Sequence, residues 1–247
     1  MIRGVTTRRR LDPDARGGLR LTLAAVGGLV LAVPFGLLLL LVADCWGPLT
    51  RLDQRVDEAL HGPALAHRSY VQVLQAISLV LSPSVFQVVG VVVAVVLILR
   101  RQPRLAAWLV VTVVGSGLLD TVVKDLVGRR RPVFAVPVAH ARSTSFPSGH
   151  AVGVVAGVGA LLLVGLPLVA PALRRPLVLL GAVVIVLVGF SRIGLGVHFL
   201  TDVIGGYVLG AAWLALTTSV FMAWRRDLGR PARPLDAGLE PAVAERP

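Results

Sequence analysis

Long apolar runs, separated by short polar stretches, dominate the pattern of this chain. A helix needs about 20 mostly apolar residues to span a bilayer. Runs that approach or exceed this length occupy residues 21–43, 85–99, 105–127, 150–166, 177–190 and 203–222. The pattern therefore predicts an all-α membrane protein, a polytopic bundle of six transmembrane helices.

A weaker pattern lies between the first two runs. Within residues 51–61, the apolar side chains Leu52, Val56 and Leu60 recur every four positions among charged residues. This spacing predicts a short helix that lies in the membrane interface with its apolar face buried. The stretch 69–81 is either a second interfacial helix or the start of the next span. We therefore expect one or two short interfacial helices beside the six spans.

Composition strengthens the membrane interpretation. The 247 residues are 55% hydrophobic and only 15% charged, with a mean hydropathy of +0.81, whereas soluble chains carry about 25% charged residues. The net charge of +12 does not indicate a nucleic-acid partner, because the cations stand in short clusters beside apolar runs. The single cysteine, Cys45, excludes an internal disulfide.

Positive charges predict the orientation in the cell membrane. Four arginine clusters fall on one side of a six-span bundle: Arg3, Arg8, Arg9, Arg10, Arg16 and Arg20; Arg100, Arg101 and Arg104; Arg174 and Arg175; and Arg225, Arg226, Arg230 and Arg233. The positive-inside rule places that side, and both termini, in the cytoplasm. We expect a basic N-terminal segment at 1–20, a membrane domain at 21–224 and a disordered cytoplasmic tail at 225–247.

Glycines recur at helix-packing spacing in the fourth and sixth runs. Gly153 and Gly157 follow Gly149, and Gly206 and Gly210 form a second pair. This spacing permits close approach between spans. We expect packing to be the role of all of them except Gly149, which stands in a polar string.

Three polar strings are predicted on the non-cytoplasmic face. They are KDLVGRRRP at 124–132, PSGH at 147–150 and SRIGLGVHFLTD at 191–202. Ionisable residues at the ends of spans are costly and therefore suggest a function. Together the strings supply three cations, a hydroxyl and the amide groups of a helix N-terminus, which suit a tetrahedral phosphate. The groups concerned are Lys124, Arg131, Arg192, Ser148 and Gly149.

Each of these groups has a simpler interpretation when taken alone. Lys124 could pair with Asp120 one helical turn earlier. Ser148 could serve as the N-cap of the fourth span, a role compatible with phosphate binding. His198 and Asp202 could be only a hydrogen-bonded pair at i and i+4. The convergence of all three strings favours the phosphate site.

Two histidines complete the predicted reaction centre. Asp202 can accept a hydrogen bond from one ring nitrogen of His198 and leave the other as a free lone pair for nucleophilic attack. His150 has no adjacent carboxylate in the sequence and suits a general acid. The strings contain no cluster of acidic residues or thiols that would hold a catalytic metal. We therefore expect neither a metal nor another cofactor.

The three strings resemble the signature of the type 2 phosphatidic acid phosphatase family, KxxxxxxRP, PSGH and SRxxxxxHxxxD, and match it at every signature position. The resemblance implies a six-span, metal-independent lipid phosphate phosphatase. It implies that His198 is the nucleophile that forms a phosphohistidine, that Asp202 orients it, and that His150 is the general acid and then the base. The phosphate oxygens would be bound by Lys124, Arg131, Ser148, Gly149 and Arg192.

The resemblance implies a lipid substrate in the bilayer, namely phosphatidate, phosphatidylglycerol phosphate or a polyprenyl diphosphate. Arg129 and Arg130 either hold a second phosphate, which would favour a diphosphate, or are solvated charges. Two alternatives stay open: transfer of the phosphate to an alcohol acceptor, and a non-catalytic protein that binds or transports an anion. The sequence does not define the oligomeric state. The predicted non-cytoplasmic face also carries Arg129, Arg130, Arg131 and Arg142, contrary to the positive-inside rule. We therefore expect these four arginines to have a local role.

Overall fold

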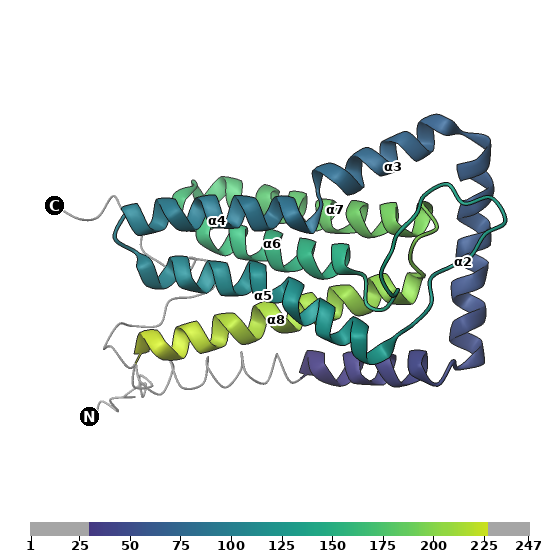
Figure 1. Ribbon diagram of the computed structural model, residues 1–247. Helices are drawn as coiled ribbons and strands as arrows, with labels where there is room; N and C mark the ends of the chain where they lie inside the picture. Colours follow the sequence, from purple (N-terminus) through teal and green to yellow (C-terminus); the bar gives the residue numbers. More distant parts are fainter. Residues whose placement is uncertain (1–29, 227–247) are drawn as a thin grey trace, which may run out of the picture.

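A computed structural model of the chain describes residues 30–226, and every regular element within them is helical. The described part of the first helix is Val30–Ala43, followed by α2 (Gly47–Ala66), α3 (Arg68–Val80), α4 (Pro83–Leu99), α5 (Pro103–Val127), α6 (Gly149–Gly165), the short 3-10 helix η1 (Leu166–Leu168), α7 (Pro171–Gly194) and α8 (Leu200–Arg226) (Figure 1). The predicted all-α fold is confirmed.

Five helical segments in this part of the chain are long and apolar enough to cross a membrane: Arg68–Leu99, Pro103–Val127, Gly149–Leu168, Pro171–Gly194 and Leu200–Met222. A sixth is present if the first helix and α2, which meet at 87°, count as one bent span. The start of the first predicted span at residue 21, the basic segment 1–20 and the tail from 227 lie outside the described residues. Valine and leucine side chains are exposed on the outside of the bundle, as contact with lipid requires.

The central helix of the bundle is α6, which packs against α4, α5, α7 and α8. Glycine permits two of these close approaches. A Cβ atom on Gly157 would lie 2.7 Å from Phe86 of α4, and one on Gly206 would lie 2.7 Å from Ala151 of α6. The predicted packing role of these glycines is confirmed.

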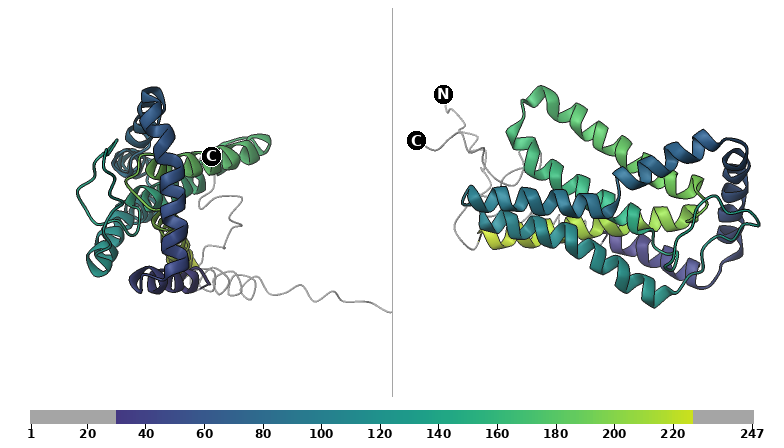
Figure 2. Two further views of the ribbon diagram at one scale, coloured as in Figure 1. Left: turned by 90° about the vertical axis from the view of Figure 1, so that its right-hand side faces the viewer. Right: turned by 45° about the horizontal axis from the view of Figure 1, so that its top comes forward.

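The helix α2 lies across one end of the bundle (Figure 2). The helix predicted around residues 51–61 is therefore present and longer than expected. The side of α2 that faces the protein carries the buried Asp53 and Asp57, whereas Leu52 is 46% exposed. Val56 does pack inward. The sequence pattern did not indicate that these carboxylates are buried; Asp53 pairs with the cation Arg129.

Residues 69–81 form most of α3, which leads through Leu81 and Ser82 into α4. The start of α4 at Pro83 follows from proline's missing N–H, which a helix does not need in its first turn. Together α3 and α4 make one 32-residue candidate span. This favours the alternative in which 69–81 begins the next span.

The chain brings the three polar strings to the same end of the bundle. After α5, Gly128 adopts a left-handed conformation, with φ of 62°, that ends the helix. The irregular segment 129–148 then passes beside α2 and returns to α6 (Figure 1). The short connection 195–199 joins α7 to α8 at this same end, and the arginines between α4 and α5 lie at the opposite one.

Candidate active site

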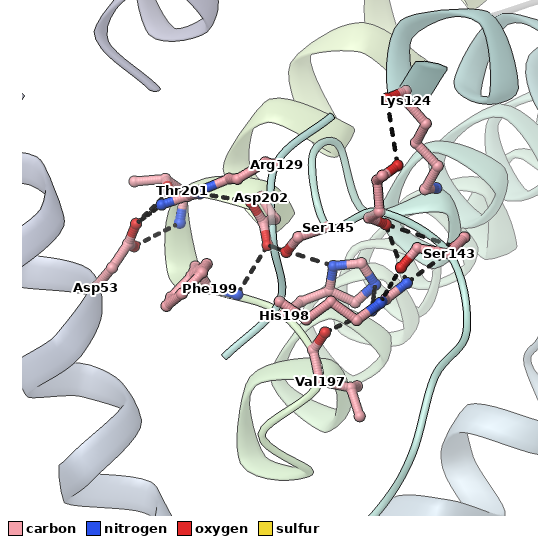
Figure 3. Close-up of polar contacts among 12 residues, drawn as sticks. Asp53, Lys124, Arg129, Ser143, Ser145, Val197, His198, Phe199, Thr201 and Asp202 are labelled. Atoms are coloured by element: carbon pink, nitrogen blue, oxygen red, sulfur yellow. Dashed lines mark hydrogen bonds and ion pairs between the residues drawn. The ribbon is translucent and has the colours of Figure 1, made fainter. Parts of the chain in front are cut away.

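His198 lies in the connection between α7 and α8 and is 2% exposed. Its Nδ1 is 3.4 Å from Oδ2 of Asp202, and its Nε2 is 3.0 Å from Nη1 of Arg131 (Figure 3). A guanidinium can only donate hydrogen bonds, so Nε2 accepts and Nδ1 carries the hydrogen that faces Asp202. Burial, with help from Arg131 and Arg192 and against the effect of Asp202, lowers the pKa of His198 to about 4. The ring is therefore neutral at neutral pH.

Asp202 is fully buried, and its carboxylate accepts hydrogen bonds from four donors. Its Oδ1 accepts from Nη1 of Arg129 at 2.6 Å. Its Oδ2 accepts from Nδ1 of His198, from the hydroxyl of Ser145, and from the N–H of Phe199 at 2.9 Å. The last contact caps the start of α8, where Asp202 is the third residue. The predicted pair of His198 and Asp202 is present, with Ser145 as an unpredicted partner.

A cavity of about 310 Å³ opens beside His198. Six of the eight predicted site residues line it: Lys124, Arg131, Gly149, His150, Arg192 and His198. The other two stand directly behind the wall. Ser148 precedes Gly149 and is fully buried, and its Oγ has no hydrogen-bond partner in the part of the chain that the structure describes. The structure thus brings all eight residues together.

The side of the cavity where we expect phosphate to bind, called the phosphate side below, lies where α6 begins, with Ser148 as the N-cap residue. The first amide groups of a helix have no partners within the helix and attract anions. Lys124 lies here, with Nζ 2.5 Å from Oδ2 of Asp120, so the simpler pairing is also present. A Cβ atom on Gly149 would lie 2.6 Å from Oδ2 of Asp120 and 3.0 Å from Nζ of Lys124. A side chain at this position would displace one or both groups from this helix end.

His150 is held by a residue that the sequence did not indicate. Its Nε2 lies 3.2 Å from the carbonyl oxygen and 3.3 Å from the hydroxyl of Ser78, in α3. The Ser78 hydroxyl also accepts a hydrogen bond from Arg192. Ser78 therefore joins the predicted general acid to a predicted phosphate-binding cation. No spacing in the sequence connects it to either, since it lies 72 residues before His150.

Arg131 ties the irregular segment to the connection that carries His198. It donates from Nε to the carbonyl oxygen of Ser143 at 2.5 Å and from Nη2 to that of Thr144 at 3.1 Å. It also donates from Nη1 to the carbonyl oxygen of Val197 at 2.5 Å. These bonds fix a cation against Nε2 of His198.

Neither interpretation of Arg129 fits the structure. The guanidinium pairs with Asp202 and, through Nη2 at 2.7 Å, with Asp53 of α2. It is thus neither a solvated charge nor a ligand for a second phosphate. Arg130 is exposed, as a solvated charge would be. Among the described residues, no group of three or more His, Cys, Asp or Glu side chains is placed to hold a metal ion.

Comparisons with known proteins bear on the same part of the chain. The model of the PAP2 superfamily matches residues 105–226. Phosphatidylglycerophosphatase B of Bacillus subtilis is 43% identical over 96 residues, which are 38% of this chain and 46% of that protein. An undecaprenyl-diphosphatase of Sulfolobus acidocaldarius is 34% identical over 129 residues, which are 50% of this chain and 58% of that protein. The chain thus spans about half the length of these curated relatives.

A solved structure extends the likeness to the fold. The crystal structure of a transmembrane PAP2-type phosphatidylglycerolphosphate phosphatase from Bacillus subtilis has a TM-score of 0.65 and 28% sequence identity. The similar part covers 76% of this chain and 94% of that one. All eight predicted site residues fall within residues 105–226, the segment that the PAP2 superfamily model matches. The family resemblance is confirmed by the match of residues 105–226 to the model of the PAP2 superfamily.

Proposed function

We propose that this protein is a lipid phosphate phosphohydrolase that works through a phosphohistidine on His198. One observation carries the proposal. The buried, neutral ring of His198 lines a cavity together with Lys124, Arg131 and Arg192, and its Nε2 faces Arg131. A ring nitrogen that carries no hydrogen and lies beside a cation, in a site with three cations, fits attack on a phosphorus atom once the phosphate takes the place of that contact. It does not fit a protein that only holds an anion, which has no need of an oriented nucleophile.

The proposed reaction has two steps. Nε2 of His198 forms a bond to phosphorus while the bond to the leaving oxygen breaks, and His150 gives that oxygen a proton. Asp202 faces Nδ1 of His198 and stabilises the positive ring of the intermediate. The three cations and the amide groups at the start of α6 stabilise the charge on the equatorial oxygens, which is the main task in phosphoryl transfer. In the second step His150 accepts a proton from water, whose oxygen bonds to phosphorus while the bond between phosphorus and Nε2 of His198 breaks. This releases phosphate and restores the neutral ring of His198.

The substrate class follows from location and from the relatives. The cavity lies at one end of a membrane-spanning bundle, so a phosphate whose carrier stays in lipid can reach it. The relatives are named for phosphatidylglycerophosphate and undecaprenyl diphosphate. We therefore propose a phospholipid phosphate, such as phosphatidate or phosphatidylglycerol phosphate, or a polyprenyl diphosphate.

A panel of these lipids, presented to the purified chain in detergent with free phosphate as the readout, tests this proposal. Phosphate release from at least one lipid, retained in EDTA, is the expected result. Labelled phosphate that appears on an added alcohol instead would indicate a phosphotransferase. Binding of the lipids without release or transfer of phosphate would contradict the enzymatic function.

The site is proposed to face the outside of the plasma membrane, with both termini in the cytoplasm. Arginines at the opposite end of the bundle, between α4 and α5 and near the start of α7, support this orientation. Single cysteines at the exposed positions Arg142 and Arg175, in a Cys45→Ser background, provide the test. An impermeant thiol reagent added to intact cells should label the cysteine at 142 and spare the one at 175. The reverse pattern would place the site in the cytoplasm.

A further inference from the structure

Behind the proposed nucleophile lies a buried row of three charges, two of which are not part of the family signature. It runs from Asp53 in α2, through Arg129 in the segment after α5, to Asp202 at the start of α8 (Figure 3). Both carboxylates are fully buried, and the side chain of Arg129 is 15% exposed. Three segments far apart in the sequence thus meet immediately behind His198.

Hydrogen bonds and a ring contact fix the positions of Asp53 and Arg129. Asp53 accepts from Nη2 of Arg129 at 2.7 Å, and from the N–H and hydroxyl of Thr201 at 3.0 and 2.5 Å. Arg129 also donates to the hydroxyl of Thr201 at 2.8 Å, and its guanidinium lies 4.3 Å from the ring centre of Phe199. Asp53 therefore fixes both the cation that contacts Asp202 and the first turn of the helix that carries Asp202.

The charges themselves affect the proposed chemistry. A guanidinium 2.6 Å from Asp202 cancels much of the negative charge that Asp202 would present to His198. Asp53 is paired with the same guanidinium from the other side and offsets that cancellation. The group of three therefore keeps one net negative charge next to a ring that becomes positive when it is phosphorylated. Buried charges interact strongly, because water does not screen them.

We propose that Asp53 and Arg129 are positioning residues for phosphoryl transfer, which hold Asp202 against Nδ1 of His198 and set the negative charge it presents. This inference rests on the proposed phosphohistidine mechanism. Neither residue touches the cavity, so both act through Asp202. The alternative is a purely structural tie between α2 and α8.

Variants that change the net charge of Asp53, Arg129 and Asp202 distinguish the positioning role from the purely structural tie. Asp53→Asn leaves the group of three neutral, Arg129→Gln leaves two unpaired buried carboxylates, and the double variant restores one net negative charge. Thr201→Val is the matched control, because it removes the hydroxyl hydrogen bonds of Thr201 to Asp53 and Arg129 without changing any charge. The full-length chain in detergent is mixed with a lipid that the wild type hydrolyses, carrying a radioactive terminal phosphate, and phosphoenzyme formation is followed in a single turnover.

We expect Asp53→Asn to slow phosphoenzyme formation by about tenfold to a hundredfold, the range found when outer-layer partners of metal-binding histidines are removed. The KM for the lipid should stay within about threefold, because no cavity residue changes. Thr201→Val should slow the step less than Asp53→Asn, even where both variants melt at the same temperature. The double variant should be faster than either single variant.

Three outcomes would overturn the inference. The first is a wild-type rate in Asp53→Asn, and the second is an equal loss in Thr201→Val and Asp53→Asn. The third is a double variant as slow as the slower single variant, which a purely structural tie predicts. A wild-type chain that forms no phosphoenzyme with any lipid would instead overturn the proposed function, and this inference with it.

Discussion

The two sides of the cavity differ in how completely their polar groups are paired. On the nucleophile side, both nitrogens of His198 and both carboxylate oxygens of Asp202 have partners. On the phosphate side, three buried atoms have no hydrogen-bond partner in the described part of the chain: Oγ of Ser148, Nε of Arg192 and Oδ1 of Asp120. These groups on the nucleophile side are therefore all hydrogen-bonded, whereas the phosphate side has two donors and one acceptor without partners in that part of the chain.

This difference indicates which groups act through position and which act through a ligand. A buried polar atom without a partner costs about 1–3 kcal/mol, so native structures hold few of them. Oxygen atoms of a phosphate could accept hydrogen bonds from Ser148 and Arg192 and remove that cost. We therefore interpret the nucleophile side as preorganised by the fold and the phosphate side as completed by the substrate.

Replacement of His198 by alanine tests the preorganised side and should have the largest effect. His198→Ala removes the proposed nucleophile, and we expect phosphate release to fall at least a hundredfold, as it does when nucleophiles are lost elsewhere. Circular dichroism should show an unchanged helix content. Release above about a hundredth of the wild-type rate would exclude His198 from the role of nucleophile.

Replacement of Ser148 by alanine tests the side that the ligand completes. Because Oγ of Ser148 has no partner to lose, Ser148→Ala should lower kcat/KM by about tenfold without lowering the melting temperature. Ser145→Ala is the matched control, since its hydroxyl bonds to Asp202 and its loss should destabilise the protein. A melting temperature that falls equally in both variants would contradict the distinction between the two walls.

Asp120 should weaken the binding of anions to the same wall. Its carboxylate holds Nζ of Lys124 and reaches the start of α6, where a phosphate would have to approach. Asp120→Asn should therefore lower the inhibition constants of inorganic phosphate and vanadate severalfold, because a competing negative charge is removed. The exposed Asp125→Asn controls for net charge. Unchanged or weaker inhibition would argue against an anion site beside Asp120.

The smallest effect is expected at a buried carboxylate of α2 near Asp53 and Asp202. Asp57 in α2 is 4% exposed, and its Oδ1 lacks a partner among the described residues. Burial first, and then Asp53 and Asp202, raise the pKa of Asp57 from 3.8 to about 7, although Arg129 lowers it. Between these pH values the folded protein holds a proton that the unfolded chain lacks, so stability falls as pH rises through this window.

Asp57→Asn removes the carboxylate that is responsible for this pH dependence. The variant should melt a few degrees above the wild type at pH 8, and the difference should shrink as pH approaches 4. Glu58→Gln, an exposed neighbour in α2, should show no such trend. A difference in melting temperature that is constant from pH 4 to pH 8 would refute the assignment to Asp57.

The sequence predicted the parts of the site that follow from helical spacing within a string. The pair of His198 and Asp202, and that of Lys124 and Asp120, both follow from a separation of four residues. Asp53 could not be found in this way, because its partners Arg129 and Thr201 lie 76 and 148 residues away. Within α2 itself, the alternation of charged and apolar residues indicates only a helix in the membrane interface. The pairing of Asp53 with Arg129 becomes visible only in the assembled bundle.

The bond between Asp53 and Thr201 also has a consequence for biosynthesis. Asp53 leaves the ribosome 148 residues before Thr201, its partner at the start of the last span. Until α8 is inserted, Asp53 lacks its two hydrogen bonds from Thr201, and Arg129 lacks Asp202. A chain that is arrested or truncated before α8 therefore holds neither a finished nucleophile nor a settled α2. The proposed reaction centre can therefore form only after α8 has been inserted.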